Sequence, residues 1–353
     1  MVGAVLVRGG RIIGEGYHEY FGGPHAEVAA LAAARSAGND PAGATMYVTL
    51  EPCCHHAKTP PCTEAIIRAG IARVVVAMTD PDERVAGRGI AALRAAGVEV
   101  VVGVRSGEAR QLLAAYITLR TKGRPWVICK WAQSLDGRIA TFTGHSRWIS
   151  SERSRRRVHL LRGQCDGVCV GAGTVQADDP LLTNRSGTGK QPARVVLDAR
   201  LEISPACRLL GSTDVSPVIV ATPAPAPAGR AGVLRAAGAE VLELPRGGDG
   251  VDLSALLAEL GRREWTYLLV EGGRGVLSAF IRSGLADELM VFVAPLLVGG
   301  RRSPGPVDWE DVSSIDQAMR LTRPQVEQVG PDVLLRYVLS EPAGSAGDIG
   351  QNE

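Results

Sequence analysis

The sequence has little of several features that mark large classes of proteins. Aromatic residues make up only 4% of its 353 residues, and 39 basic residues nearly balance 37 acidic ones. A nucleic-acid or membrane-surface binder would carry a basic patch, so we expect neither kind of partner. No apolar run approaches the roughly 18 residues of a membrane span, and the first residues do not have the pattern of a signal peptide.

A disulfide framework is also missing. The seven cysteines are an odd number, and Cys129, Cys165, Cys169 and Cys207 stand singly in apolar strings. We expect these four to be small core residues. Unpaired cysteines fit a reducing compartment, and we therefore expect a cytoplasmic protein.

The composition that remains is ordinary for a globular protein, with 45% hydrophobic and 22% charged residues. The fold class that we expect, from the order of the elements, is α/β. A chain of this length predicts two domains. Strand and helix patterns alternate on both sides of Gly123-Arg124-Pro125, which predicts sheets flanked by helices. We expect domains at 1–122 and 124–340 and a disordered, small and polar tail at 341–353.

Hydrophobic periodicity predicts the elements of both domains. In the first we expect strands at 2–7, 11–17, 45–50, 72–78 and 98–102, and helices at 28–37, 63–69, 87–96 and 108–121. In the second we expect strands at 126–131, 166–170, 194–198, 218–221, 240–244, 267–270, 289–294 and 333–339, and helices at 151–164, 229–238, 253–262 and 271–283.

One constellation in the first domain predicts a metal site. His25-Ala26-Glu27 opens a helix, Cys53 follows a strand, and Cys62 opens another helix, where a thiolate is stabilised. Catalytic zinc has three protein ligands and one open position, and zinc deaminases add a glutamate that is not a ligand. We assign His25, Cys53 and Cys62 as Zn²⁺ ligands and Glu27 as the proton carrier.

Other interpretations of this stretch stay open. The cysteines could be buried thiols or part of a structural zinc site, which has four protein ligands. The usual deaminase spacing is P-C-x-x-C, but eight residues separate the two cysteines here. Cys54, His55 and His56 are therefore rival ligands.

Two glycine-rich strand ends in the second domain predict a nucleotide site. Residues 171–174 (GAGT) and 272–275 (GGRG) each follow a strand, and the latter opens a helix. Such turns present N–H groups to phosphate, although the sequence has no G-x-G-x-x-G fingerprint. Two of them in one sheet favour a single extended ligand such as a dinucleotide.

Several long motifs resemble one family over about residues 1 to 340. EPCCHHAKTPPC resembles the deaminase half of the bifunctional riboflavin-biosynthesis deaminase–reductases. SLDGRIA, SRWIS, GAGTVQADDPLLTNR and VEGGRGVLSAF resemble their reductase half. The resemblance implies a cytidine-deaminase-like zinc domain followed by a dihydrofolate-reductase-like domain, with Zn²⁺ and NADPH as cofactors. This chain has Cys54 where the family usually has Ser or Thr.

The resemblance also implies roles for single residues in the second domain. NADPH would contact Ala132, Trp148, Thr174, Asp178, Gly273, Arg274, Gly275, Val276, Leu277, Ser278 and Ala279. The substrate would contact Ser146, Arg162, Leu182, Arg185 and Glu271. Arg162 and Arg185 suit a ribose phosphate, because a guanidinium fork matches phosphate oxygens.

Without the resemblance, simpler interpretations compete at several of these positions. Trp148 could be a core residue, and Asp178 and Asp179 could cap a helix or a turn. Lys130 ends the expected strand and could orient the ribose, but a solvated lysine is an equal alternative. Asp136 has no assigned role.

The implied function is two consecutive steps on a small pyrimidine ribose-phosphate, zinc-dependent deamination and NADPH-dependent reduction, in a homo-oligomer. The family begins upstream of this chain's first strand with a helix and an Asn-Pro segment, which implies weak deamination by the chain as given. Three rivals remain: a reductase with a structural zinc domain, an RNA or nucleoside deaminase, and a non-enzymatic zinc-dependent nucleotide-binding module.

Overall fold

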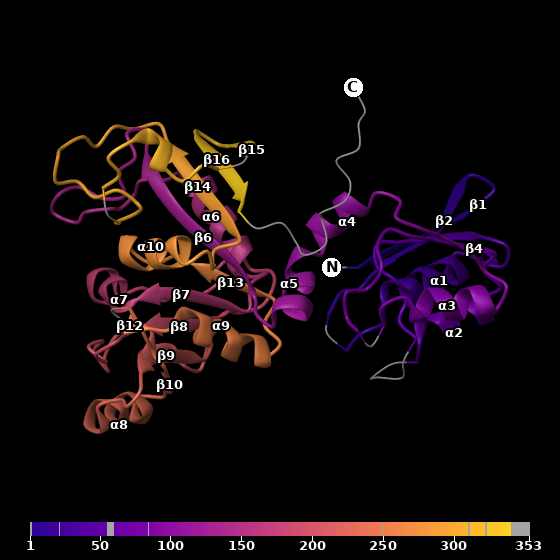
Figure 1. The fold of residues 1–353 in the computed structure, drawn as a ribbon, viewed down its shortest axis with the longest axis horizontal. Coiled ribbons are helices and arrows are strands. Elements are labelled where there is room, and N and C mark those ends of the chain that lie inside the picture. The colour runs from indigo at the N-terminus through magenta and orange to yellow at the C-terminus, as the bar shows by residue number, and fades with distance from the viewer. Residues whose placement is uncertain are drawn as a thin grey trace. The chain divides into compact units, whose positions relative to one another are not determined.

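The structure is a computed structural model that describes residues 2–20, 22–54, 60–83, 85–248, 250–309, 311–321 and 323–339. The chain forms two compact units, which divide between Lys122 and Gly123. Each unit is built around its own sheet (Figure 1). Within the described residues, no helix has the length and apolar character needed to cross a bilayer.

The first unit contains five strands and five helices among the described residues. They are β1 (Gly3–Arg8), β2 (Arg11–Tyr17), α1 (Ala26–Ser36), β3 (Thr45–Val48), α2 (Cys62–Arg68), β4 (Arg73–Val76), α3 (Arg88–Ala95), β5 (Glu99–Val102), α4 (Ser106–Leu112) and α5 (Ala114–Lys122). The sheet order is β2-β1-β3-β4-β5. Strand β1 is antiparallel to both of its neighbours, and β3, β4 and β5 are parallel.

Helices α1, α2 and α3 share one apolar core with the sheet, which includes Leu6, Met46 and Ile66. Small residues let α1 approach β2 closely: a Cβ atom at Gly16 would lie 2.3 Å from the main-chain nitrogen of Ala30. This packing holds the N-terminus of α1 against the sheet. A second group of helical residues from α4 and α5 packs on Leu50 and Met78.

The second unit contains a larger sheet. The helices and strands of this unit are β6 (Trp126–Ser134), α6 (Glu152–Arg162), β7 (Gly167–Gly171), α7 (Ala172–Asp178), β8 (Ala193–Leu197), β9 (Val218–Pro223), α8 (Ala228–Ala236), β10 (Glu240–Leu244), β11 (Arg246–Gly247), β12 (Gly250–Val251), α9 (Leu253–Arg262), β13 (Tyr267–Val270), α10 (Arg274–Arg282), β14 (Glu288–Ala294), β15 (Gln325–Val329) and β16 (Asp332–Val338). Short 3₁₀ helices lie at Leu210–Ser212 and Ile315–Gln317.

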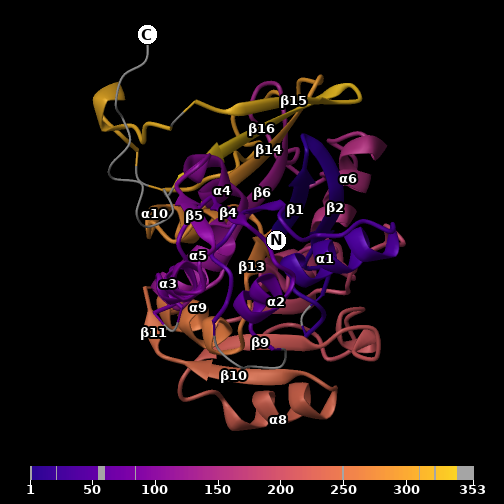
Figure 2. The same ribbon diagram turned by 90° about the vertical axis from the view of Figure 1, so that its right-hand side faces the viewer.

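The strand order of the nine-stranded sheet is β10-β9-β8-β7-β13-β6-β14-β16-β15. The seven strands from β10 to β14 are parallel, and β16 and β15 add an antiparallel edge. Figure 2 shows β10 beside α8 at one edge of this sheet and β15 at the other. Ligands of open parallel sheets bind at the carboxyl ends of the strands. In this unit, we therefore expect a ligand site at the carboxyl ends of the central strands β7, β13 and β6.

The elements differ from the sequence predictions in a few places. The expected helix 108–121 is two helices, because the chain breaks at Leu113. Residues 171–174 were predicted to form a turn, but Gly171 is the N-cap residue of helix α7, which begins at Ala172. Strand β15 was not predicted because four of its five residues are exposed.

The four cysteines expected in the core are all buried and unpaired. The expected disordered tail at 341–353 and the rival ligands His55 and His56 lie outside the described residues.

Candidate functional site

Three metal-binding side chains of the first unit converge on one point. The Nδ1 atom of His25 lies 3.5 Å from the Sγ atom of Cys53 and 3.2 Å from that of Cys62. All three ligand atoms lie within 4.8 Å of one another. Atoms held at about 2.1 and 2.3 Å by a tetrahedral zinc are about 3.5 Å apart, so the donor set and its spacing fit that metal.

Local structure explains why these three residues meet. His25 is the N-cap residue of α1, and Cys62 is the first residue of α2. The main-chain N–H of Cys62 donates to the sulfur of Cys53 at 3.3 Å. The N-terminus of α2 therefore stabilises a thiolate at Cys53, as a helix dipole does for an anion.

A buried carboxylate fixes the strand end before Cys53. Glu51 accepts hydrogen bonds from the main-chain N–H groups of Asp80, Gly87 and Ile90 at 3.1, 2.8 and 3.1 Å. Glu51 is only 3% exposed, and its bonds tie β3 to the start of α3. The segment just before Cys53 is thus fixed to the start of α3.

Glu27 lies in the first turn of α1 and is 3% exposed. Burial is the main cause that raises its pKa to about 7. A carboxyl group with a pKa near neutrality can both take up and release a proton, which is the property of a general acid–base.

The two thiols titrate as a pair. The hydrogen bond with Cys62, followed by that with His25, lowers the pKa of Cys53 to about 4 despite burial, and the same contact raises the pKa of Cys62. Contacts with Cys62 and His25 thus favour the thiolate form of Cys53. Cys54 is not among the converging side chains, and burial raises the pKa of its thiol.

In the second unit, the two glycine-rich strand ends are joined directly. The main-chain N–H of Gly273 donates to the hydroxyl of Thr174 at 3.0 Å. A Cβ atom at Gly272 would lie 2.9 Å from Val276 and 3.3 Å from the nitrogen of Gly171, so this close approach requires glycine. The ends of β7 and β13 and the N-termini of α7 and α10 therefore form one surface.

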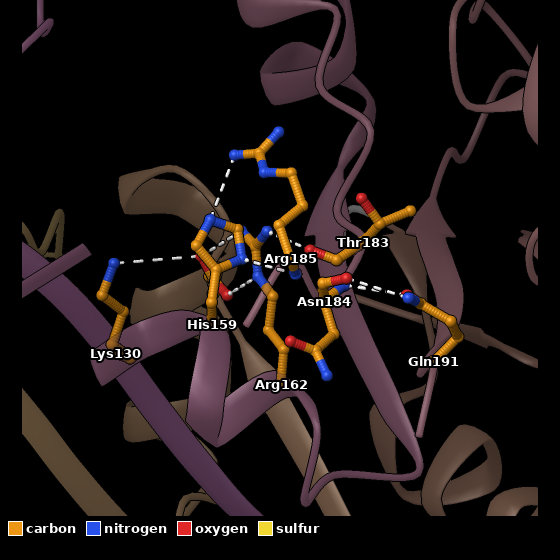
Figure 3. A network of polar contacts seen from close by, with 8 residues as sticks. Lys130, His159, Arg162, Thr183, Asn184, Arg185 and Gln191 are labelled. Atoms are coloured by element: carbon orange, nitrogen blue, oxygen red, sulfur yellow. Dashed lines mark hydrogen bonds and ion pairs between the residues drawn. The ribbon is translucent and has the colours of Figure 1, made fainter. Parts of the chain in front are cut away.

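A buried ion network lies at the end of β13 (Figure 3). Arg162 donates from Nε and Nη2 to the two carboxylate oxygens of Glu271 at 2.7 and 2.9 Å, and from Nη1 to the carbonyl of Thr183 at 3.1 Å. The ammonium of Lys130 lies 3.8 Å from Glu271. Burial alone would raise the pKa of Glu271, but Arg162 and Lys130 lower it to about 2, which keeps it ionised.

This network changes the interpretation of Lys130. It lies within β6, not at its end, and its side chain is only 15% exposed. The alternative of a solvated lysine is therefore wrong. Burial lowers the pKa of Lys130, while Glu271 opposes that shift.

Arg185 lies beside this network, against His159 of α6. Its Nη2 lies 3.1 Å from His159 Nε2, and its main-chain N–H donates to His159 Nδ1 at 3.3 Å. Sequence reasoning missed His159, although it lies three residues before Arg162 and therefore shares a helix face with it.

The loop from Asp179 to Arg185 has a constrained backbone. Asp179 and Leu182 have positive φ angles of 40° and 54°. The fully buried Arg194 donates to the carbonyls of Leu181 at 3.4 Å and Ser212 at 2.7 Å, and this anchors the loop. Asp179 is the C-cap residue of α7 and accepts from the main-chain N–H of Arg208, so the capping interpretation holds for this residue.

The remaining candidates are distributed around the glycine-rich ends. Trp148 is 66% exposed, which excludes the core interpretation, and the Arg155 guanidinium lies 4.4 Å from its ring centroid. The neighbouring Arg147 donates to the carbonyl of Asp178 at 2.7 Å, which links the Trp148 segment to α7.

Residues 273–279, which were predicted to contact NADPH, differ in their exposure to solvent. Gly273, Arg274, Gly275 and Ala279 are exposed, and Val276 is half-buried. The side chain of Leu277 belongs to the core, and Ser278 accepts a hydrogen bond from the main chain of Asp308 at 2.6 Å. The first turn of α10 therefore offers a continuous exposed surface at Gly273, Arg274 and Gly275.

Three further candidate residues lie within β6 or follow it. Ala132 lies in β6, and Ser146 lies between β6 and α6. Asp136 accepts from the main-chain N–H groups of Val298 and Gly299 at 3.1 and 2.7 Å, so it joins the end of β6 to a distant loop.

Comparison with known proteins identifies both halves. The model of the RibD C-terminal domain matches residues 125–335, and that of the cytidine and deoxycytidylate deaminase zinc-binding region matches residues 1–78. Riboflavin biosynthesis protein RibD of Aquifex aeolicus (strain VF5) is 44% identical over 337 residues, 95% of this chain and 91% of that protein. The Escherichia coli (strain K12) protein of the same name is 38% identical over 96% of this chain and 92% of its own.

Solved structures agree with this. Acinetobacter baumannii RibD has a TM-score of 0.82 at 36% identity, covering 96% of this chain and 91% of its own. The diaminohydroxyphosphoribosylaminopyrimidine deaminase/5-amino-6-(5-phosphoribosylamino)uracil reductase of Thermotoga maritima has the same TM-score and coverage at 38% identity. The predicted fold class, a cytidine-deaminase-like domain followed by a reductase domain, is confirmed. This chain belongs to the RibD family of bifunctional deaminase–reductases of riboflavin biosynthesis.

Proposed function

We propose that this protein catalyses two consecutive steps on one substrate. The unit at 1–122 deaminates 2,5-diamino-6-ribosylamino-4(3H)-pyrimidinone 5′-phosphate at its 2-amino group. The unit at 124–340 then reduces the ribosyl side chain of the product to ribityl with NADPH. The substrate is thus a small pyrimidine ribose-phosphate, as the name of the Thermotoga maritima relative indicates for that protein.

The observation that carries the deaminase step is the meeting of His25, Cys53 and Cys62 beside a buried carboxyl group. A zinc ion held by these three residues would supply an activated water at neutral pH. Glu27, two residues after His25, can accept a proton at its carboxylate and return it to a pyrimidine ring nitrogen and to the departing amino group.

The observation that carries the reductase step is the joined glycine-rich surface beside an ionised network. The N-terminus of α10 offers main-chain N–H groups for the NADPH phosphates, and the exposed ring of Trp148 offers an apolar face for its nicotinamide. NADPH would supply the hydride. Glu271 stays ionised, so its carboxylate can stabilise positive charge on the ribosylamine as the sugar opens to an imine.

Lys130 and Arg162 keep Glu271 in place for that role. Both cations contact its carboxylate, and all three side chains are nearly inaccessible to solvent. We therefore assign Lys130 a positioning role. The predicted homo-oligomeric state and cytoplasmic location remain predictions.

The direct test is incubation of the purified protein with the diaminopyrimidinone phosphate, with and without NADPH, followed by mass analysis. We expect the deaminated ribosyl product without NADPH and the ribityl product with it. Reduction of the deaminated compound without any deamination would favour a reductase with a structural zinc domain. Turnover of neither compound would overturn the proposal.

A further inference from the structure

Helix α6 carries a run of arginines, and one of them has no carboxylate partner. Arg156 pairs with Glu152 on the same helix at 3.8 Å. Arg155 has no ion pair within the part of the chain that the structure describes, and its Nη1 donates to the main-chain carbonyl of Ser150 at 2.6 Å. A carbonyl oxygen does not neutralise a guanidinium, so the positive charge of Arg155 remains uncompensated.

This charge lies against the ring of Trp148. The central carbon of the Arg155 guanidinium is over the ring, 4.4 Å from its centroid, which is within the roughly 6 Å of a cation–π contact. The bond to Ser150, two residues after Trp148, holds the guanidinium in place. Trp148 is nevertheless 66% exposed, so the face of its ring opposite Arg155 is open to a ligand.

The Trp148 segment is connected to the glycine-rich surface. Arg147 donates to the carbonyl of Asp178 at 2.7 Å, which ties the segment to α7. The chain of α7 also includes Thr174, whose hydroxyl accepts from the main-chain N–H of Gly273 at the start of α10. The next steps rest on the proposed function, in which the NADPH phosphates bind at this surface and the nicotinamide stacks on the open face of Trp148.

The nicotinamide changes its charge during the proposed reduction. The hydride leaves C4 of NADPH with two electrons, and the neutral dihydronicotinamide becomes a pyridinium with one positive charge. A ring stacked at van der Waals distance on the open face of Trp148 lies about 8 Å from the Arg155 guanidinium. The pyridinium is repelled across this distance, whereas the neutral ring is not. The phosphates are the same in both forms, so they do not contribute to this difference.

We propose that Arg155 acts through Trp148 as a positioning residue for the nicotinamide, and that its uncompensated charge makes the site bind NADPH in preference to NADP⁺. The oxidised product is then the weaker ligand, and fresh NADPH displaces it. The same charge makes bound NADPH a poorer hydride donor, because the pyridinium is the disfavoured state. Arg155 therefore favours exchange of the cofactor at the expense of the hydride step.

Two substitutions separate the charge of Arg155 from its packing. Arg155→Met removes the charge and keeps an unbranched apolar side chain over the indole ring. Arg155→Lys keeps the charge and can still donate to the carbonyl of Ser150. Arg156→Met is the matched control, because it removes the same charge from the next residue of α6, which is exposed and pairs with Glu152.

The experiment measures the dissociation constants of NADPH and NADP⁺ by calorimetry with the full chain. Repulsion between two unit charges about 8 Å apart near a protein surface predicts that Arg155→Met lowers the ratio of Kd for NADP⁺ to Kd for NADPH about 5-fold. We expect Arg155→Lys and Arg156→Met to keep the wild-type ratio. A role of Arg155 in packing alone would weaken both nucleotides equally, and an unchanged ratio in Arg155→Met would overturn the proposal.

The ratio is independent of turnover, so it separates this proposal from the proposed function. If Arg155→Met shifts the ratio but the wild-type protein converts no pyrimidine, the proposed function fails and the role of Arg155 stands. If the wild-type protein converts the pyrimidine but the ratio does not shift, the role of Arg155 fails alone. Binding of neither nucleotide would overturn both.

A second measurement needs no variant and decides the question if Arg155→Met does not fold. Salt screens charges that are open to solvent, so we expect the wild-type ratio of Kd for NADP⁺ to Kd for NADPH to fall between about 0.05 M and about 1 M NaCl. A ratio that does not change with salt would overturn the role of the Arg155 charge.

Discussion

The hydroxyl of Thr174 accepts a hydrogen bond from the main-chain N–H of Gly273 at 3.0 Å, across 99 residues of sequence. This contact joins the ends of β7 and β13, which are neighbours in the sheet. It orients the first turn of α10, where main-chain N–H groups are free to bind an anion. Thr174 thus acts on the proposed NADPH site through the backbone that it holds.

Replacing Thr174 tests this role. Thr174→Val keeps the shape but removes the acceptor, and a net hydrogen-bond energy of about 1 kcal/mol predicts about 5-fold weaker NADPH binding. Thr174→Ser should bind nearly as the wild type does. The control is Thr121→Val, because the Thr121 hydroxyl donates to the carbonyl of Ile117 within its own helix. Fluorescence titration with NADPH gives all four affinities, and equal values for Thr174→Val and Thr174→Ser would contradict the role.

A second prediction concerns the stability of the Glu271 network. Glu271→Gln leaves the buried cations Arg162 and Lys130 without their carboxylate, and breaking a buried pair costs about 3–5 kcal/mol. We expect a much lower unfolding temperature at pH 7. Glu327→Gln, which breaks the exposed pair with Arg157, should cost less than about 1 kcal/mol.

The pH dependence follows from the depressed pKa of Glu271. The pKa of a glutamate in the unfolded chain is about 4.3, whereas Arg162 and Lys130 lower the pKa of Glu271 in the folded protein to about 2. The contribution of this group is therefore complete above the unfolded value and is lost as the pH falls towards 2. We expect the unfolding temperature to fall less between pH 7 and pH 3 in Glu271→Gln than in the wild type. An equal fall in both proteins would contradict this prediction.

Most of the regular elements could be predicted from the sequence because their signals are local. Strand β13 and helix α9 match their predicted ranges, since both combine hydrophobic periodicity with clear breaks. The edge strand β15 was missed because it is largely exposed and carries no apolar pattern. The helix break at Leu113 was missed because no Gly or Pro marks it.

The two sites differ in how far the sequence could predict them. The convergence of His25, Cys53 and Cys62 was expected because a His, a Glu two residues later and two further cysteines, placed at the ends of elements, are the parts of a zinc deaminase site. The ion network could not be predicted, because Lys130 lies in β6 and Glu271 follows β13, and the adjacency of these two strands depends on the sheet order. Periodicity does not specify that order.

Metal analysis of two cysteine variants tests the proposed zinc ligands. Cys62→Ala removes a sulfur that lies 3.2 Å from His25 Nδ1, so we expect loss of most of the bound zinc. Cys54→Ala should keep about one zinc per chain, because Cys54 lies outside the converging group. Zinc lost from Cys54→Ala and kept in Cys62→Ala would reverse the assignment. The reductase activity of both variants serves as the control for folding.

The role of Glu27 can be separated from the metal by Glu27→Gln. The amide keeps the shape of the buried side chain but cannot carry the proton between the water, the ring nitrogen and the amino group. General acid–base catalysis contributes about 10²–10⁴-fold, so we expect deamination to fall by that factor. Zinc content and NADPH-dependent reduction of the deaminated substrate should stay unchanged. Glu99→Gln, which breaks only an exposed pair with Arg73, is the matched control in the same unit. Deamination by Glu27→Gln at the rate of this control would remove Glu27 from the mechanism, whereas loss of zinc would assign it to the metal site.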